Sequence, residues 1–364
     1  MFRKSTAFLA LALLAGLAAW PAKKKKDDET QTLQLPKELP PAVVGQTRRL
    51  TFYVTPLSAK GLLSQQVRDA LKALDRLDGD DTVLQIRAFL AGTGDLRRVR
   101  DLISETFTER RQPLPAVSII QSGGLPLNGA QVVLEAVAES HKDLHPGGIA
   151  WISAQIAAAA DPLAPAAPLA EKSIAGLHDA LTAAGLAAAD VLRVTCFVSS
   201  LDNADAVRAR LASEFPRAPF DLVQTQREPI RAVAGCEAVA AAPAETAGPP
   251  VQLLQPGPDG SQTAILRAPH AVFTGAQLSF GFEDRDARLA FDRLGKVMAQ
   301  TGVSPRDVAF ARFYPLSEKM ADQVRRVRTG FFDAAHLPAG SLLLFEGLSS
   351  QDSGFAVDVV AGKD

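Results

Sequence analysis

Along this chain of 364 residues, segments whose apolar residues alternate as in a strand are followed by segments whose apolar residues have helical spacing. The segment "VLRVTCFVSSLDNADAVRARL" (191–211) begins with an apolar, strand-like run, continues through a polar turn and ends in apolar residues at helical spacing. The same design occurs in residues 83–103 and in residues 308–328. The pattern therefore predicts a strand followed by an amphipathic helix three times.

The distance between the copies indicates the size of the repeated unit. Phe89, Phe197 and Phe313 take the same place in the three copies, at separations of 108 and 116 residues. Val207 also lies 108 residues after Val99. In the third copy, Val324 lies 117 residues after Val207, one residue more than the separation of Phe313 from Phe197. This period is far longer than the roughly 20–50 residues of solenoid repeats and matches one small domain. A chain of this length has room for two or three domains.

Each copy predicts the element order β-α-β-α-β-β. In the middle copy, strand patterns lie at 147–157, 191–198, 220–226 and 234–242, and helical patterns at 169–185 and 204–215. Two helices can cover one face of a mixed sheet. The strands are apolar on both sides, so the second sheet face must also be hidden, and another copy is the natural cover.

Three motifs recur in this order and resemble the RidA/YjgF family. "ISAQ" (152–155) and "TGAQ" (274–277) resemble its S-G-Q strand-turn, and the strand-helix unit resembles its central segment. "GGLPLNGAQVVLEAVA" (123–138) and "REPIRAVAGCEAVA" (227–240) resemble its closing segment. The likeness covers nearly all of residues 50–362. It implies an α+β fold of three tandem RidA-like (chorismate mutase-like) domains. Because family members are generally trimers with clefts between subunits, we expect a monomer that forms an intrachain pseudo-trimer.

The N-terminus has the layout of a secretory signal. Arg3 and Lys4 precede an apolar run of 14 residues, Ala7–Trp20, which is shorter than the roughly 20 residues of a spanning helix. The domains are then a signal peptide (1–22), a charged, Pro-rich tether (23–48), domain 1 (49–140), domain 2 (148–243), a linker (244–261) and domain 3 (262–362). We expect a periplasmic or secreted protein with no membrane contact after signal removal.

Charge and motifs exclude several functions. With 39 basic and 40 acidic residues the net charge is −1, so nucleic acid is not an expected partner. His141 and His145 lie four residues apart without a third ligand, which makes a poor zinc site. The chain has no nucleotide-binding fingerprint and no nucleophile elbow. We expect neither a metal nor a cofactor.

The resemblance implies hydrolysis of enamines and imines, for which active family members use an arginine nine residues before the closing proline. The corresponding positions are Val117, Phe220 and Gly340, and none can hold a carboxylate by paired hydrogen bonds. Arg227 or Arg312 could compensate only if the side chain reached the same cleft. We therefore expect the standard deaminase activity to be absent.

Seven residues remain as candidates for binding a small-molecule ligand in the clefts: Ser153, Gln155, Gly275, Gln277, Glu135, Glu237 and Asp358. The three acidic residues could orient a water, but we favour strand positions that face solvent. The two glutamines could line a cleft or satisfy the backbone of their turns.

Two further questions stay open on sequence alone. The resemblance makes the strands of Cys196 and Cys236 neighbours, so the pair could be a disulfide or two buried thiols. The leading hypothesis is binding of a small metabolite. The alternatives are a divergent deaminase or other hydrolase, and a structural or partner-binding module with closed clefts.

Overall fold

The computed structural model describes residues 35–92, 94–244, 248–254, 261–334 and 337–364. The expected signal peptide and the first part of the tether lie outside the described residues. Pro36–Asp364 forms one compact unit. In the described part of the chain, no helix is long and apolar enough to cross a membrane.

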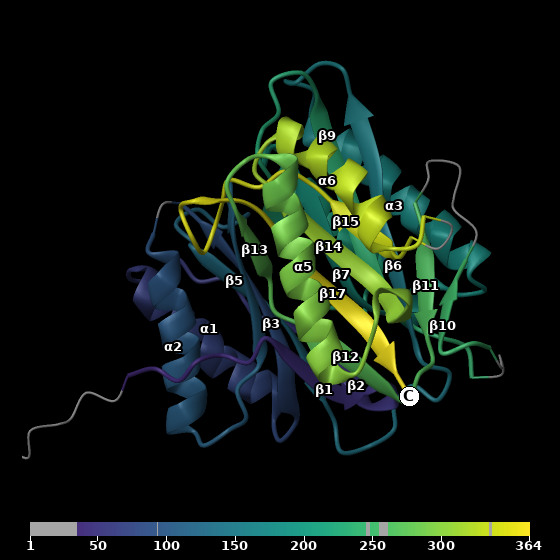
Figure 1. Cartoon of the computed structure of the whole chain (residues 1–364). Helices are drawn as coiled ribbons and strands as arrows, with labels where there is room; N and C mark the ends of the chain where they lie inside the picture. Colours follow the sequence, from purple (N-terminus) through teal and green to yellow (C-terminus); the bar gives the residue numbers. More distant parts are fainter. Residues whose placement is uncertain (1–34, 93, 245–247, 255–260, 335–336) are drawn as a thin grey trace, which may run out of the picture. The chain divides into compact units, whose positions relative to one another are not determined.

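The described residues form a mixed α+β structure in which the order β-α-β-α-β-β occurs twice and then a third time with two additional strands, β13 and β16 (Figure 1). The first repeat comprises β2 (Leu50–Val54), α1 (Leu63–Asp78), β3 (Thr82–Ala91), α2 (Leu96–Glu109), β4 (Ala116–Ser122) and β5 (Val132–Glu139). The second comprises β6 (Ile149–Ala159), α3 (Ala166–Ala183), β7 (Val191–Val198), α4 (Ala204–Glu214), β8 (Phe220–Gln224) and β9 (Ala232–Ala241). The third comprises β12 (His270–Thr274), β13 (Gln277–Phe280), α5 (Asp284–Thr301), β14 (Val308–Pro315), α6 (Glu318–Phe331), β15 (Ala339–Leu342), β16 (Gly347–Leu348) and β17 (Ser353–Lys363). Short 3-10 helices lie at η1 (Thr47–Arg49), η2 (Ala188–Asp190) and η3 (Pro305–Asp307).

The three sheets share one strand order. It is β2-β5-β3-β4 in the first repeat, β6-β9-β7-β8 in the second and β12-β17-β14-β15 in the third. In each, one pair is parallel (β3/β4, β7/β8 and β14/β15), because a helix connects the two strands. Amphipathic helices cover one face of each sheet and bury their apolar side chains there.

Segments that we expected to be connections extend these sheets. β1 (Ala42–Gln46) lies within the expected tether and pairs with β12 of the third repeat. β10 (Val251–Leu253) lies within the expected linker, and β11 (Thr263–Leu266) follows it. These two strands extend the second sheet beside β6 instead of joining the third. Strand pairing therefore ties the N-terminal part of the compact unit to its C-terminal part.

The register corrects one sequence equivalence. Arg87 lies opposite Glu135, Thr195 opposite Glu237 and Arg312 opposite Asp358. The residue two positions later is Phe89, Phe197 or Tyr314, and these three share one apolar cluster. Phe313 instead packs under α5 and α6, so its predicted equivalence with Phe89 and Phe197 is wrong. Tyr314 lies 117 residues after Phe197, the offset that also separates Val324 from Val207.

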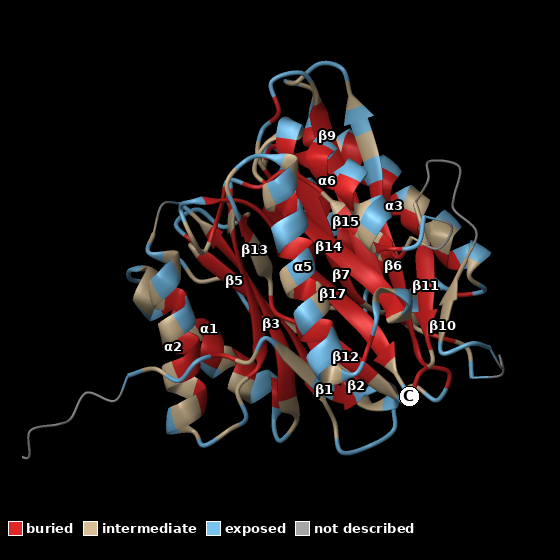
Figure 2. Cartoon of the chain, viewed as in Figure 1, coloured by how far each residue is buried: buried red, intermediate tan, exposed pale blue. Residues whose placement is uncertain are grey.

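The second face of each sheet is buried against the other sheets. One shared layer contains Phe52, Trp151, Phe273 and Phe310, and another contains Phe89, Phe197, Tyr314 and Phe345. Figure 2 shows the resulting continuous burial along the central strands. Burial of both sheet faces explains why the strands are apolar on both sides.

The two cysteines are joined in a disulfide, which resolves the open question in favour of the bond. Cys196 and Cys236 lie directly opposite each other on β7 and β9. Both side chains are fully buried in the core beneath α3 and α4.

Candidate functional site

Between the two shared apolar layers the structure buries a central charge cluster. It consists of Arg87, Glu135, Arg193, Asp221, Glu237, Arg312 and Asp358. Arg87 Nε lies 2.6 Å from Glu135 Oε2 and Arg87 Nη2 lies 2.7 Å from Glu237 Oε1, which joins the first two repeats. Arg312 Nη1 lies 3.1 Å from Asp358 Oδ1, and Ser118 Oγ donates to Asp358 Oδ2 at 2.6 Å, which joins the third repeat to the first.

The expectation that Glu135, Glu237 and Asp358 face solvent is wrong. Their exposed fractions are 1%, 4% and 0%, because the neighbouring sheets cover this strand face. Sequence reasoning did not assign Arg87 or Arg193 to any site. Arginine inside an otherwise apolar strand was the available signal, since buried charges need partners.

The neighbouring charges of the cluster shift the pKa values of its carboxyl groups. Burial raises the pKa of Glu135 and of Glu237, but the nearby arginines outweigh burial and hold both pKa values below the ordinary range. Burial, followed by the charge of Glu135, raises the pKa of Asp221 well above its ordinary value. Carboxylates with lowered pKa values are poor general bases, and the cluster is suited to holding the repeats together.

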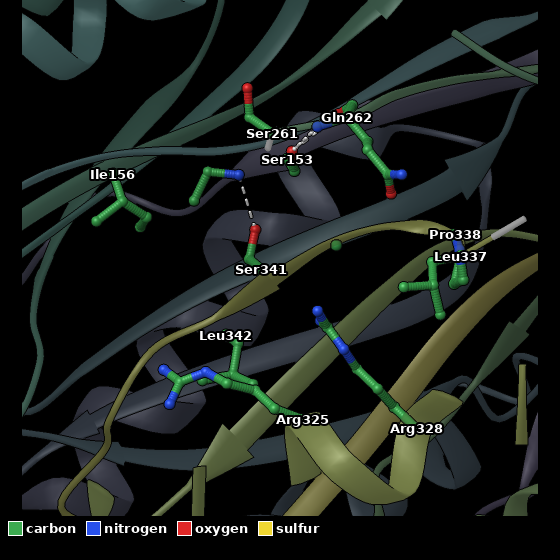
Figure 3. Close-up of a pocket in the computed structure, with 12 residues that line it drawn as sticks. Ser153, Ile156, Ser261, Gln262, Arg325, Arg328, Leu337, Pro338, Ser341 and Leu342 are labelled. Carbon is green, nitrogen blue, oxygen red and sulfur yellow. Dashed lines mark hydrogen bonds between the residues drawn. The ribbon is translucent and has the colours of Figure 1, made fainter. Parts of the chain in front are cut away.

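The first cleft, which we call the Arg328 pocket, lies between the second and third repeats and has a volume of about 350 Å³. Figure 3 shows its lining, which comes from β6, the segment before β11, α6 and the surroundings of β15: Ser153, Ala154, Ile156, Ser261, Gln262, Arg325, Arg328, Leu337, Pro338, Gly340, Ser341 and Leu342. Ser341 Oγ accepts a hydrogen bond from the Ala154 backbone N–H at 3.0 Å and so connects the two walls.

Arg328 is the distinctive group of this pocket. Among the described residues no carboxylate pairs with it, and its Nε has no hydrogen-bond partner. Its guanidinium carbon lies 5.8 Å from the ring centre of Phe313. Burial, followed by the charge of Arg325, lowers its pKa. Arg325 is instead neutralised by Asp322, whose Oδ1 lies 2.6 Å from Arg325 Nη1. An uncompensated cation therefore lies in the pocket that Gly340 lines.

The second cleft, the Phe220 pocket, lies between the first and second repeats and has a volume of about 400 Å³. Its apolar lining consists of Val54, Pro56, Leu57, Leu77, Pro126, Val133, Pro219, Phe220 and Leu222, and its polar lining of Thr55, Arg208 and Asp221. Phe220 and Gly340 hold equivalent register positions, beside Val194 and Ala311. The two pockets thus occupy related clefts but differ in polarity.

In the third cleft, between the third and first repeats, hydrogen bonds to backbone carbonyls bring the walls together. The Ala276 N–H donates to Val117 O at 3.3 Å, and Gln85 Nε2 donates to Thr274 O at 2.8 Å. A Cβ at Gly275 would lie only 2.8 Å from Val117 O, so glycine permits this approach. Val117 and Gly275 therefore contact each other.

The remaining candidates have structural hydrogen bonds. Gln155 Nε2 donates to Ser153 O at 2.8 Å and Gln277 Nε2 donates to Gly275 O at 3.0 Å, so each glutamine satisfies its own turn. His141 and His145 bond to separate backbone carbonyls, those of Asp80 and Leu50. Within the described residues no group of three metal-binding side chains converges.

Comparison with known proteins adds the following. No protein-family model matches the chain, and no curated protein sequence matches it. Among solved structures, a YjgF family member from Neisseria meningitidis is 14% identical, with a TM-score of 0.25, and the match covers 31% of this chain and 95% of that one. A YjgF/YER057c/UK114 family member from Mycobacterium tuberculosis is 17% identical, with a TM-score of 0.25, over 31% of this chain and 99% of that one. A Rid family protein of unknown function from Yersinia pestis is 14% identical, with a TM-score of 0.25, over 28% of this chain and 84% of that one.

Proposed function

We propose that this chain is an exported protein of three tandem RidA-like domains that binds a small carboxylate in the Arg328 pocket. The observation that carries the proposal is the half-buried guanidinium of Arg328, which has no carboxylate partner among the described residues and lies in the same pocket as Gly340. In the third repeat, Gly340 takes the position that the resemblance assigns to the substrate-binding arginine. Arg328 of α6 supplies a cation to the same cleft instead.

The physical argument concerns the cost of an unpaired cation. A partly buried guanidinium has lost part of its water without gaining an anion, as its lowered pKa reflects. A bound carboxylate compensates for the lost hydration because it accepts two parallel hydrogen bonds from the planar guanidinium. Arg325 keeps its own carboxylate partners, so it does not need the ligand.

We expect no standard imine deaminase activity. Val117, Phe220 and Gly340 supply no cation, and the Val117 carbonyl accepts a hydrogen bond from Ala276 across the third cleft. Glu237, one candidate for orienting a water, is bonded to Arg87 and has a lowered pKa, so it is a weak base. No metal or cofactor is part of the proposal.

Calorimetry with the mature chain tests the binding. 2-Oxobutyrate is the probe, and butanone, which lacks the carboxylate, is its matched neutral analogue. Arg328→Met should weaken 2-oxobutyrate binding by more than about tenfold, since a hydrogen bond to a charged group contributes about 1.5–3 kcal/mol. Arg326→Met is the control, because Arg326 lies on the same helix, is exposed and pairs with Asp284 at 3.0 Å.

The outcomes separate the candidate functions. Equal affinity of the Arg328→Met variant and the parent would contradict the proposal. Accelerated hydrolysis of short imino acids, generated in situ, would support the divergent deaminase instead. If neither binding nor turnover occurs, the partner-binding module becomes the better explanation.

A further inference from the structure

The Phe220 pocket differs chemically from the Arg328 pocket, although both lie between adjacent repeats. Nine of its twelve lining residues are aliphatic, aromatic or proline, and Phe220 itself lines the wall. A cavity of about 400 Å³ is within the range of small-molecule sites, which are mostly apolar with a few polar groups that fix orientation. The lining therefore favours a ligand with a bulky apolar body.

A helix arginine recurs at the edge of both open clefts. Arg208 follows Val207 on α4, and Arg325 follows Val324 on α6, where both valines are buried core residues of their repeats. Arg208 lines the Phe220 pocket and Arg325 lines the Arg328 pocket. The Arg208 side chain is 46% exposed, and its ion pair with Asp205 spans 3.7 Å, so its guanidinium stays available to another anion.

The acidic residue of the Phe220 pocket does not oppose an anion. Both carboxyl oxygens of Asp221 are sealed from solvent, and Asp221 faces Glu135, Arg87 and Arg193 of the charge cluster. Burial and the charge of Glu135 raise the pKa of Asp221, which disfavours its charged form, and its carboxyl group points away from solvent. Arg208 is thus the ionisable lining residue whose side chain is accessible to a ligand.

We propose that the Phe220 pocket is a second binding site, for a carboxylic acid with an aromatic or branched apolar body whose carboxylate pairs with Arg208. The body lies against Phe220, Leu57 and the prolines, and the carboxylate stays at the half-exposed rim. This site is independent of the Arg328 pocket, so each proposal can fail alone.

Calorimetric titration of the mature chain tests the second site, with 3-phenylpropionate as the probe. Propionate lacks the apolar body and 3-phenylpropanamide lacks the charge. We expect 3-phenylpropionate to bind at least about tenfold more tightly than propionate, because burial of a phenyl group favours binding. Arg208→Met should weaken 3-phenylpropionate binding about fivefold and leave the amide unchanged. Arg210→Met is the matched control, since Arg210 lies on the same helix and pairs with Glu214 at 2.8 Å.

A second variant tests the pocket itself. Leu77 lines the wall and is 47% exposed, so Leu77→Glu should fold normally yet abolish binding of 3-phenylpropionate by placing a negative charge there. Arg328→Met should leave this binding intact. Equal affinities for propionate and 3-phenylpropionate, or full binding by Leu77→Glu, would overturn the proposal. Loss of binding in Arg328→Met alone would assign the ligand to the other pocket and also overturn it.

Discussion

Arg87→Met should destabilise the fold more than any ordinary surface substitution. Arg87 contacts Glu135 at 2.6 Å, Glu237 at 2.7 Å and Thr195 at 3.2 Å, all in the buried interior. Methionine approximates the chain length but removes the cation. Of the described arginines, Arg193 at 3.6 Å then remains beside Glu135, which also accepts from the Thr195 hydroxyl, and Arg312 at 3.7 Å remains beside Glu237. Removing one member of a buried ion pair costs about 3–5 kcal/mol, a large part of the 5–15 kcal/mol that stabilises a typical domain.

Urea unfolding followed by circular dichroism measures this loss as a shift of the midpoint. Arg98→Met is the control, because Arg98 pairs with Glu105 at 2.7 Å on the surface and such pairs contribute about 0–1 kcal/mol. The pH dependence gives a second readout. In the parent, the lowered pKa values of Glu135 and Glu237 contribute stability above the ordinary carboxyl range, which is lost as pH falls through the folded pKa values.

In Arg87→Met, Glu135 and Glu237 lose the ion pair with Arg87. The destabilisation relative to the parent should therefore shrink as pH falls below about 4.5 and the two carboxyl groups take up protons. Adding Glu135→Gln and Glu237→Gln should partly restore stability at neutral pH, because the unpaired charges disappear. A loss below about 1 kcal/mol, or one equal to that of Arg98→Met, would refute the reasoning that these charges depend on Arg87.

Three further predictions concern other parts of the molecule. Burial, followed by the charge of Asp75, raises the pKa of Asp78 to about 6, so ionisation of Asp78 in the folded state lowers the stability as pH rises from about 4 to 6. Asp78→Asn should therefore raise the melting temperature at pH 8 but not at pH 4. An equal effect at both pH values would contradict this cause. The Cys196–Cys236 bond closes a loop with a sequence separation of 40, so replacing both with serine should cost up to about 4 kcal/mol in urea unfolding, and an unchanged midpoint would argue against it. Light scattering of the mature protein should give the mass of one chain, since the repeats bury one another's sheet faces, and a stable trimer of chains would contradict the proposed pseudo-trimer.

The sequence by itself determined the local structure and its repetition. Strand and helix periods are local properties of the chain, and the expected order of elements is present in the first two repeats, while the third has two further strands, β13 and β16. The mutual equivalence of Phe220 and Gly340 also holds in the register of β8 and β15, because both positions are counted within continuous segments. The one-residue error at Phe313 arose because two consecutive aromatic residues both suit a strand that is buried on both faces.

The tertiary structure decided what the inward side chains contact. In the sequence, Glu135, Glu237 and Asp358 have the pattern of ordinary outward strand residues, but sheets from other repeats cover them. Arg87 and Arg312 pair with Glu135 and Asp358 across neighbouring strands of their own sheets, and the packing of the sheets brings Glu237 to Arg87 of another repeat. A close backbone approach at Gly275 brings two walls together in one cleft, and in another cleft the side chain of Arg328 lines the pocket. These contacts join residues far apart in the sequence, and their energies depend on burial and distance, which hydrophobic periodicity does not encode.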